Sequence, residues 1–147
     1  MAVTISLYNT TVRKFADGTF TPSVTYKVNL YSTLTFDATA TTKTGAESGA
    51  TQLSTANGYT QNSKTLANVA TSLATTNDAI FDADDVTWTA SGGSIAASKA
   101  LIYADSLTNK DPVAYIDFGG TQTSTDGTDF KIVWSANGIV SFAYTLP

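Results

Sequence analysis

The sequence contains no cysteine, no histidine and only three prolines among its 147 residues. Without cysteine there is no disulfide framework and no thiol chemistry. Without histidine the commonest general base and metal ligand is missing, and a serine or threonine nucleophile has no imidazole to activate it. No G-x-S-x-G motif and no phosphate-binding glycine loop occurs. We therefore expect a protein that is not an enzyme, with no catalytic residues and no cofactor.

Charge is also sparse, because only 14% of the residues are charged and the net charge is −4. The eight basic residues are scattered, and only Arg13 and Lys14 are adjacent, which argues against a nucleic-acid partner. No apolar run reaches the length of a membrane span, so we expect no membrane partner. The first residues lack the basic start and apolar stretch of a signal peptide. The length fits a single domain, residues 1–147.

What the sequence has in quantity is threonine, at about one residue in five, and apolar residues that alternate with polar ones. Threonine is β-branched and favours strands. Period-two alternation predicts strands at 3–7, 24–30, 86–89, 114–118, 130–134 and 140–144, with a compact apolar run at 100–103 and extended chain at 66–73. Turn-rich links at 91–94, 108–112 and 119–127 separate them. This pattern predicts an all-β fold, a β-sandwich of jelly-roll-like form, with under about a tenth of the chain in helix.

Residues 37–63 differ from the rest, because they contain few large apolar side chains and several glycines. Only Leu53 and Tyr59 could anchor this stretch, so we interpret it as an irregular surface excursion or a segment ordered by a neighbouring subunit. Alone it would not bury enough apolar surface to offset its ordering entropy. It therefore predicts a homo-oligomer, with 37–63 and strand 3–7 as candidate contacts.

The last part of the chain predicts much of the core. A two-residue loop at Asn137-Gly138 would place the flanking apolar rows on opposite faces, whereas a three-residue loop, 136–138, places them on one face. We choose the second, with Gly138 left-handed in a bulge. It pairs Trp134 with Val140, Ile132 with Phe142, and Phe130 with Tyr144. The predicted core is Trp88, Ile116, Phe130, Ile132, Trp134 and Phe142.

Two groups of side chains could carry chemistry or binding. Asp82, Asp84 and Asp85 could hold Ca²⁺, but the residues of a helix–loop–helix site are absent, and a turn in which aspartates bond nearby amides is the simpler interpretation. We therefore predict no metal. No privileged carboxylate pair suggests glycoside hydrolysis. Most aromatic residues lie on the alternating apolar faces of predicted strands and are expected in the core. Three fit this pattern least and could instead contact a partner: Tyr8, Tyr31 and Tyr59.

The order of several short segments resembles a known family. FDADDVTWT joins an acidic turn to a V-T-W strand; DPVAYIDFGG follows with a P-x-A-x-x-D-F-G pattern; and TDFKIVWSANGIVSF closes with W-x-x-x-G-I. NGYT at 57–60 adds a G-Y-T element. Together they cover about half of the chain and resemble capsid decoration (cement, or head) proteins of tailed bacteriophages. The first 55 residues match less well, so the resemblance does not place the capsid-binding elements.

The resemblance implies a β-sandwich, commonly trimeric, with no catalytic residues to carry over. It implies a structural virion protein, made in the host cytoplasm and located on the capsid surface, that binds the major capsid protein and stabilises the phage head shell. Two alternatives stay open: a phage tail or fibre component, or a glycan-binding module. A glycan-binding module would expose an aromatic patch at one loop end.

Overall fold

The computed structural model describes residues 3–75 and 78–143, without the side chains of 74 and 75. Strands occupy 46% of the chain and helices 7%, which confirms the all-β, sandwich-like expectation. The strands are β1 (Thr4–Leu7), β2 (Tyr26–Thr33), β3 (Thr51–Gln52), β4 (Ala70–Thr75), β5 (Asp78–Asp82), β6 (Val86–Thr89), β7 (Ile95–Ala104), β8 (Pro112–Ser124), β9 (Asp129–Ile132) and β10 (Val140–Ala143), and the helices are α1 (Thr11–Ala16) and α2 (Lys43–Ala46). No helix among the described residues is long and apolar enough to cross a bilayer.

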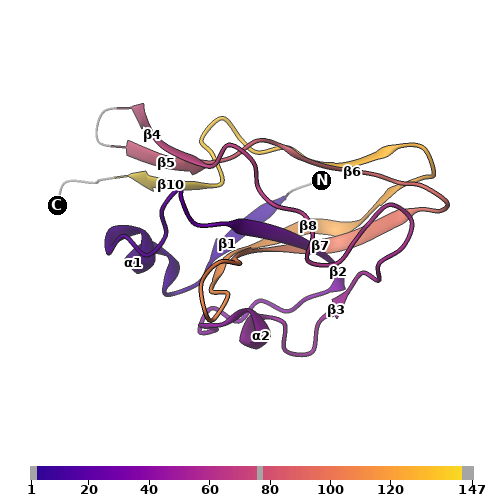
Figure 1. Ribbon diagram of the computed structural model, residues 1–147, viewed down its shortest axis with the longest axis horizontal. Helices are drawn as coiled ribbons and strands as arrows, with labels where there is room; N and C mark the ends of the chain where they lie inside the picture. Colours follow the sequence, from indigo (N-terminus) through magenta and orange to yellow (C-terminus); the bar gives the residue numbers. More distant parts are fainter. Residues whose placement is uncertain (1–2, 76–77, 144–147) are drawn as a thin grey trace.

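The strands form three antiparallel sheets arranged in layers (Figure 1). The central sheet has five strands in the order β1-β8-β7-β2-β3. A three-stranded sheet, β10-β5-β4, and a two-stranded sheet, β6-β9, cover one face of it. The segment that carries α2 covers the other face. The confirmed part of the expectation is the all-β, sandwich-like architecture.

The main core lies between the central sheet and the two smaller sheets. Alternate residues of β2, β7 and β8 face it, as the period of two requires, and the remaining space is filled from β5, β6 and β9. Five of the six predicted core residues are buried, and Phe142 is partly buried against the same cluster. The aromatic rings of Trp88 and Phe130 meet edge to face at 6.1 Å. The predicted core is therefore confirmed in its main members.

A second, smaller core lies on the opposite face of the central sheet. Here the segment from Leu34 through α2 packs against the outward-facing side chains of β2, β7 and β8. The buried members are Tyr8, Tyr31, Leu34, Ala40, Ala46, Leu101, Tyr103 and Tyr115. Most of residues 37–63 lie at the surface, as expected for a surface excursion. The stretch is held to its own chain by Ala40 and Ala46 in this second core and by the expected anchors Tyr59 and Leu53 at the main core.

The predicted final hairpin is also wrong in its pairing. β9 pairs with β6, Ile132 opposite Val86, while β10 pairs with β5, Val140 opposite Phe81. Only Ser135 and Gly138 still bridge, so the loop between them has two residues, and the chain crosses there from one small sheet to the other. Gly138 is left-handed as expected, with φ +73°. The expected pair of Phe130 with Tyr144 cannot be assessed, since residue 144 lies outside the described residues.

Two further local expectations changed. Helix α1 was not predicted, because it spans only six residues and has no side-chain cap at Thr10, so neither periodicity nor a capping signal marks it. The predicted turn at 119–127 is shorter in the structure, because β8 continues to Ser124. An irregularity in the β7–β8 register, between Ala97 and Lys99, absorbs the two glycines that suggested a turn. The stretch at 66–73, predicted as strand or extended chain, bends at Asn68, with φ +51°, and becomes strand β4 from Ala70.

Candidate functional site

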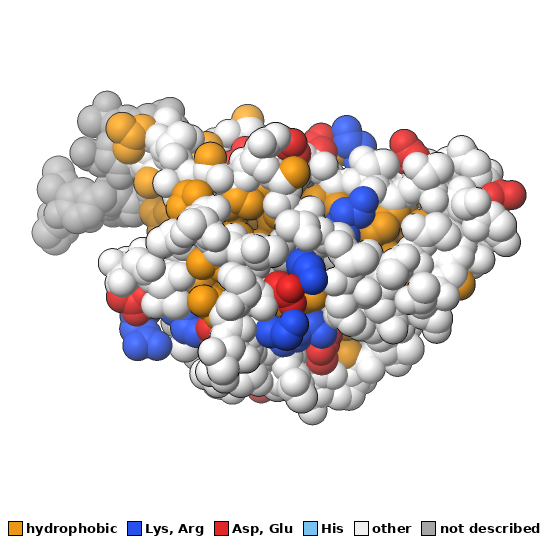
Figure 2. Space-filling model, in the orientation of Figure 1, with side chains coloured by type: hydrophobic (Ala, Val, Ile, Leu, Met, Phe, Trp, Pro, Cys, Tyr) orange, Lys and Arg blue, Asp and Glu red, His pale blue; other side chains and the backbone are white. Residues whose placement is uncertain are grey.

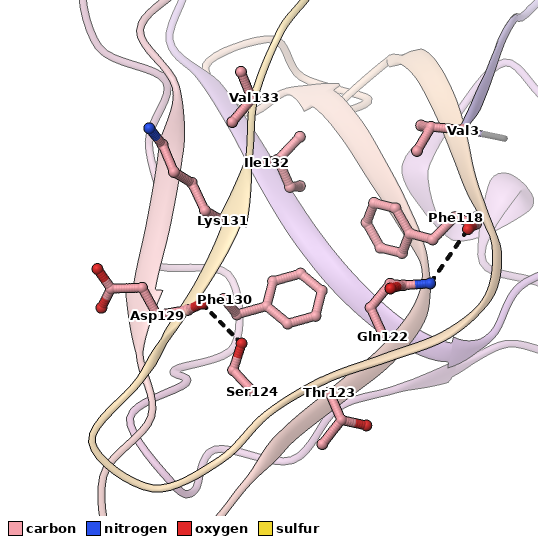
Figure 3. Close-up of a pocket in the computed structure, with 10 residues that line it drawn as sticks. All are labelled: Val3, Phe118, Gln122, Thr123, Ser124, Asp129, Phe130, Lys131, Ile132 and Val133. Carbon is pink, nitrogen blue, oxygen red and sulfur yellow. Dashed lines mark hydrogen bonds between the residues drawn. The ribbon is translucent and has the colours of Figure 1, made fainter. Parts of the chain in front are cut away.

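Two hollows in the described part of the chain each lie beside an open strand edge. The first, which we call the β1 pocket because Val3, the residue before β1, lines it, has a volume of about 530 Å³ and lies between Val3, the end of β8, and β9 (Figure 3). Phe118, Phe130 and Ile132 point into it, whereas Lys131 and Asp129 point away from it. Val3 and Val133 stand at its mouth. Its floor is therefore apolar and its charges are on the outside.

Polar groups of the β1 pocket are held by the protein itself. The Gln122 amide donates to the Phe118 carbonyl oxygen at 3.4 Å, and the Ser124 hydroxyl donates to the Asp129 carbonyl oxygen at 2.8 Å. The Asp129 carboxylate accepts from the Thr89 hydroxyl. The rings of Phe118 and Phe130 meet edge to face, with their centroids 5.8 Å apart, and both residues are almost fully buried. The arrangement suits the insertion of apolar side chains, and it shows no carboxylate pair facing a common point.

β1 is the edge strand of the central sheet, and the residue before it, Val3, lines this pocket. Within the described part of the chain its one sheet partner is β8, in a register that places Ile5 opposite Ile116. Along its apolar row the exposed fraction is 59% at Val3 and 38% at Ile5, while Leu7 packs against the main core. Protein edge strands are usually guarded by lysine, proline or a bulge. The sequence of β1, TISL, has none of these guards.

The second hollow, which we call the α1 groove, has a volume of about 390 Å³. One wall is α1 and the loop after it, and the other is the inner face of the β10-β5-β4 sheet. Its lining residues are Val12, Phe15, Ala16, Gly18, Phe20, Thr21, Pro22, Thr71, Ala79 and Phe142, none of which is charged. Phe15 bridges the walls, with its ring 5.1 Å from that of Phe142. β4 and β10, the edges of this sheet, also carry no charge.

The acidic cluster has a structural role. The Asp85 carboxylate accepts from the backbone amide of Trp134 at 3.0 Å and pairs with Lys131 at 3.0 Å. Lys131 and that amide lower the pKa of Asp85. Asp84 accepts from the Asn68 amide at 2.7 Å. The predicted bonds to nearby amides are therefore bonds to distant parts of the chain. Across the described residues, no three acidic side chains converge in a metal-binding group.

The three tyrosines expected to contact a partner are instead buried within the chain, so that expectation was wrong. Tyr8 and Tyr31 are buried in the second core, and Tyr59 is 2% exposed in the main core. The Tyr59 hydroxyl accepts from the Leu30 backbone amide at 3.1 Å. Tyr31 donates to Glu47, which pairs with Lys43 at 2.7 Å and so ties α2 to the sheet.

No family model matches this chain, and no significant match occurs among curated proteins or among solved structures. The candidate surfaces are therefore argued from the residues and their geometry. The sequence predicts strand 3–7 as a candidate contact. It does not predict the α1 groove, because three segments far apart in the sequence build this groove and only their packing brings them together.

Proposed function

We propose that this protein is a structural virion protein that decorates the capsid of a tailed bacteriophage by binding its major capsid protein. The observation that carries the proposal is the unguarded edge of β1, where Val3 and Ile5 are exposed and Val3 lines the mouth of the β1 pocket, whose floor is formed by Phe118, Phe130 and Ile132. The order of motifs between residues 57 and 142, which resembles capsid decoration proteins, supports the virion setting. In this proposal the protein is located in the virion, on the surface of the capsid.

The mechanism is stabilisation by binding. An extended segment of the capsid protein adds to the β1 edge, so that backbone hydrogen bonds provide affinity and alternate side chains enter the pocket. A protein that binds only the assembled shell shifts the equilibrium toward the assembled state by mass action. If the protein is a homotrimer, three such contacts act together, and a weak contact is strengthened through effective concentration. The choice of three subunits rests on the resemblance, and residues 37–63 remain a candidate subunit contact.

The test uses undecorated heads of the phage that encodes the chain. Ile5→Lys places a charge on the edge, in the manner by which natural edge strands avoid pairing. We expect co-sedimentation with heads to weaken about tenfold or more, a change of about 1.4 kcal/mol or more in binding free energy. The matched control is Thr35→Lys, an exposed position beyond β2. Equal binding by both variants would remove β1 from the contact.

The location and the assembly state need separate measurements. Light scattering of the free protein at micromolar concentration should give about three chain masses. Cryo-electron microscopy of the particle should place the protein on the shell. Density on the tail or fibre instead, or binding of the free protein to a glycan array, would contradict the decoration proposal and favour the tail, fibre or glycan-binding alternative.

A further inference from the structure

We propose that the capsid segment enters an open strand position beside residues 118–124 of β8, at the end of β1. It enters as a short uncharged stretch with apolar side chains at alternate positions. The inference rests on the proposed function and deepens it, because it names the place and the chemistry of the contact. β1 pairs with β8 from Ala114 to Asp117, but β8 continues to Ser124. Among the described residues no strand follows β1 on this side of β8, although β7 continues along the other side.

The open position is long enough for about four residues. Along this part of β8, from Asp117 to Ser124, β7 takes four steps, from Lys99 to Ile95. At about 3.3 Å per residue these steps span about 13 Å. Residues 1 and 2 precede β1 and lie outside the described part of the chain, and two residues reach at most about 7 Å even when fully extended. Those two residues alone therefore cannot fill the position.

The free backbone edge lies in the last, straight part of β8. Where β8 bulges around Gly119 and Gly120, the Gln122 side-chain amide donates to the Phe118 and Gly120 carbonyl oxygens, each at 3.4 Å. The bulge thus uses these acceptors internally. From Gln122 to Ser124, β7 is the one strand paired with β8 among the described residues. Hydrogen-bonded and non-bonded pairs alternate in an antiparallel ladder, so the backbone groups that β7 leaves unused face the open position and can bond to an added strand.

The β1 pocket determines which side chains fit in this position. Its floor of Phe118, Phe130 and Ile132 faces the space between β8 and β9, whereas the side chains of Asp129 and Lys131 point away from it (Figure 3). Alternate residues of a strand point to one face, so every second residue of the segment enters the pocket. A charged side chain there would be buried without a partner, which is costly. The pocket therefore selects an uncharged segment whose inward residues are apolar.

The open position is continuous with the β1 edge. Val3, the residue before β1, lines the mouth of the pocket. Neighbouring strand positions in a sheet are about 4.8 Å apart, a distance that two extended residues can cross. One capsid segment can therefore border β1 beside Ile5 and then step into the position beyond Val3. Its backbone then extends the central sheet while its apolar side chains fill the pocket.

A charge at the mouth of the pocket should prevent entry. Val133 lines the pocket and is 64% exposed, so Val133→Asp should keep the parent's circular dichroism spectrum. We expect its co-sedimentation with heads to weaken about tenfold or more, because a carboxylate stands where apolar side chains must pass. The matched control is Val12→Asp, at a valine 52% exposed. It lies beside the α1 groove, where Figure 2 shows other hydrophobic side chains gathered, and it should bind heads as the parent does.

The outcomes separate the inference from the proposed function. A parent chain that does not bind heads contradicts the proposed function, and the inference with it. If Val133→Asp and Val12→Asp bind heads equally well while Ile5→Lys binds more weakly, the inference alone is overturned. The decoration proposal would then stand, with the contact confined to the β1 edge.

The natural absence of cysteine allows the occupant to be identified directly. Val133→Cys gives the chain a single thiol, which benzophenone maleimide modifies, and irradiation of decorated heads then joins it to the occupant of the pocket. Mass spectrometry should identify an uncharged stretch of the major capsid protein with apolar residues at alternate positions. Loss of head binding on modification of Val133→Cys, but not of Val12→Cys, would also support the inference. A cross-link to a second copy of this chain or to a charged capsid segment, or normal binding without any cross-link, would overturn it.

Discussion

Trp134 joins two stretches of chain that lie far apart in the sequence. Its indole Nε1 donates to the Asp84 carbonyl oxygen at 2.9 Å, and its backbone amide donates to the Asp85 carboxylate at 3.0 Å. Its side chain is 9% exposed and packs in the main core. One residue thus fixes the link before β6 against the link after β9, where the chain crosses between the two small sheets.

Trp134→Ala should therefore be strongly destabilising. Loss of the buried ring removes transfer free energy and leaves a cavity, which together cost about 3–5 kcal/mol. The free energy of unfolding from urea titration checks this. Val133→Ala, at the neighbouring residue with 64% exposure, should change it by about 0.5 kcal/mol or less. Similar values for the two variants would show that the indole is not part of the core.

The ion pair of Lys14 with Asp111 ties α1 to the start of β8. Its atoms are 2.5 Å apart, and the side chains are only 13% and 8% exposed. Lys14→Met leaves the carboxylate buried and unpaired, which should cost about 3–5 kcal/mol. Lys110→Met is the matched control, since that lysine is 51% exposed in its pair with Asp105 and should cost about 1 kcal/mol or less. Lys14→Met with Asp111→Leu should recover much of the loss.

At the scale of elements, alternation revealed which residues face the core but not which strands are neighbours. The strand that contains Phe130 was predicted correctly, with its buried face, yet its partner is β6 rather than β10. A period of two fixes the face of a strand, whereas pairing depends on the packing of the whole chain. The hairpin rule assumed that Asn137-Gly138 joins paired strands, and here it joins two different sheets. The helices were missed because four to six residues are too few to show a period of 3.6.

The candidate surfaces divide in the same way. The β1 edge could be predicted, because a single run, residues 3–7, shows both its alternation and its lack of charge. The α1 groove could not, because Val12, Thr71 and Phe142 belong to three separate segments. The burial of Tyr8 and Tyr31 could not be foreseen either, since the alanines around α2 that cover them read as a polar, irregular stretch.

The loop before β4 is tied to β6 by a close backbone contact that glycine alone permits. Gly58 has φ +86°, and a Cβ there would lie 2.1 Å from the Thr89 carbonyl oxygen. Gly58→Ala should cost about 3 kcal/mol or more, since the left-handed conformation and the overlap both oppose it. Gly49→Ala, with φ +71° and open space around the Cβ, should cost only about 1 kcal/mol. Equal melting temperatures for the two variants would contradict the close approach.

At the scale of the whole molecule, paired carboxylates make stability depend on acidity. Lys99 and the Gly119 amide lower the pKa of Asp117. Burial raises the pKa of Asp105, but its hydrogen bonds to Lys110 and Lys27 outweigh this, and the net direction is down. A lowered folded-state pKa adds stability that is complete above the unfolded value, about 3.9, and is lost as pH falls through the folded value.

We therefore expect the urea midpoint to be nearly constant from about pH 7 to pH 5, because the chain has no histidine, and to fall steadily below about pH 4. Asp117→Asn should lower the midpoint at neutral pH and make the decline in acid shallower, because it removes one of the groups responsible. A midpoint that rises in acid, or a variant that follows the parent curve, would show that these ion pairs do not control the dependence.

The position of β1 determines how late in synthesis the central sheet can be completed. Among the described strands β1 pairs with β8 alone, and the nearby Thr11 hydroxyl donates to the Val113 carbonyl oxygen across 102 residues of chain. Contacts this remote form slowly, because a long loop must be closed before they contribute. On the ribosome, β1 must wait for β8, which is made about a hundred residues later. During that interval its unguarded edge is open along both sides, and each nascent chain is at its most exposed to pairing with another.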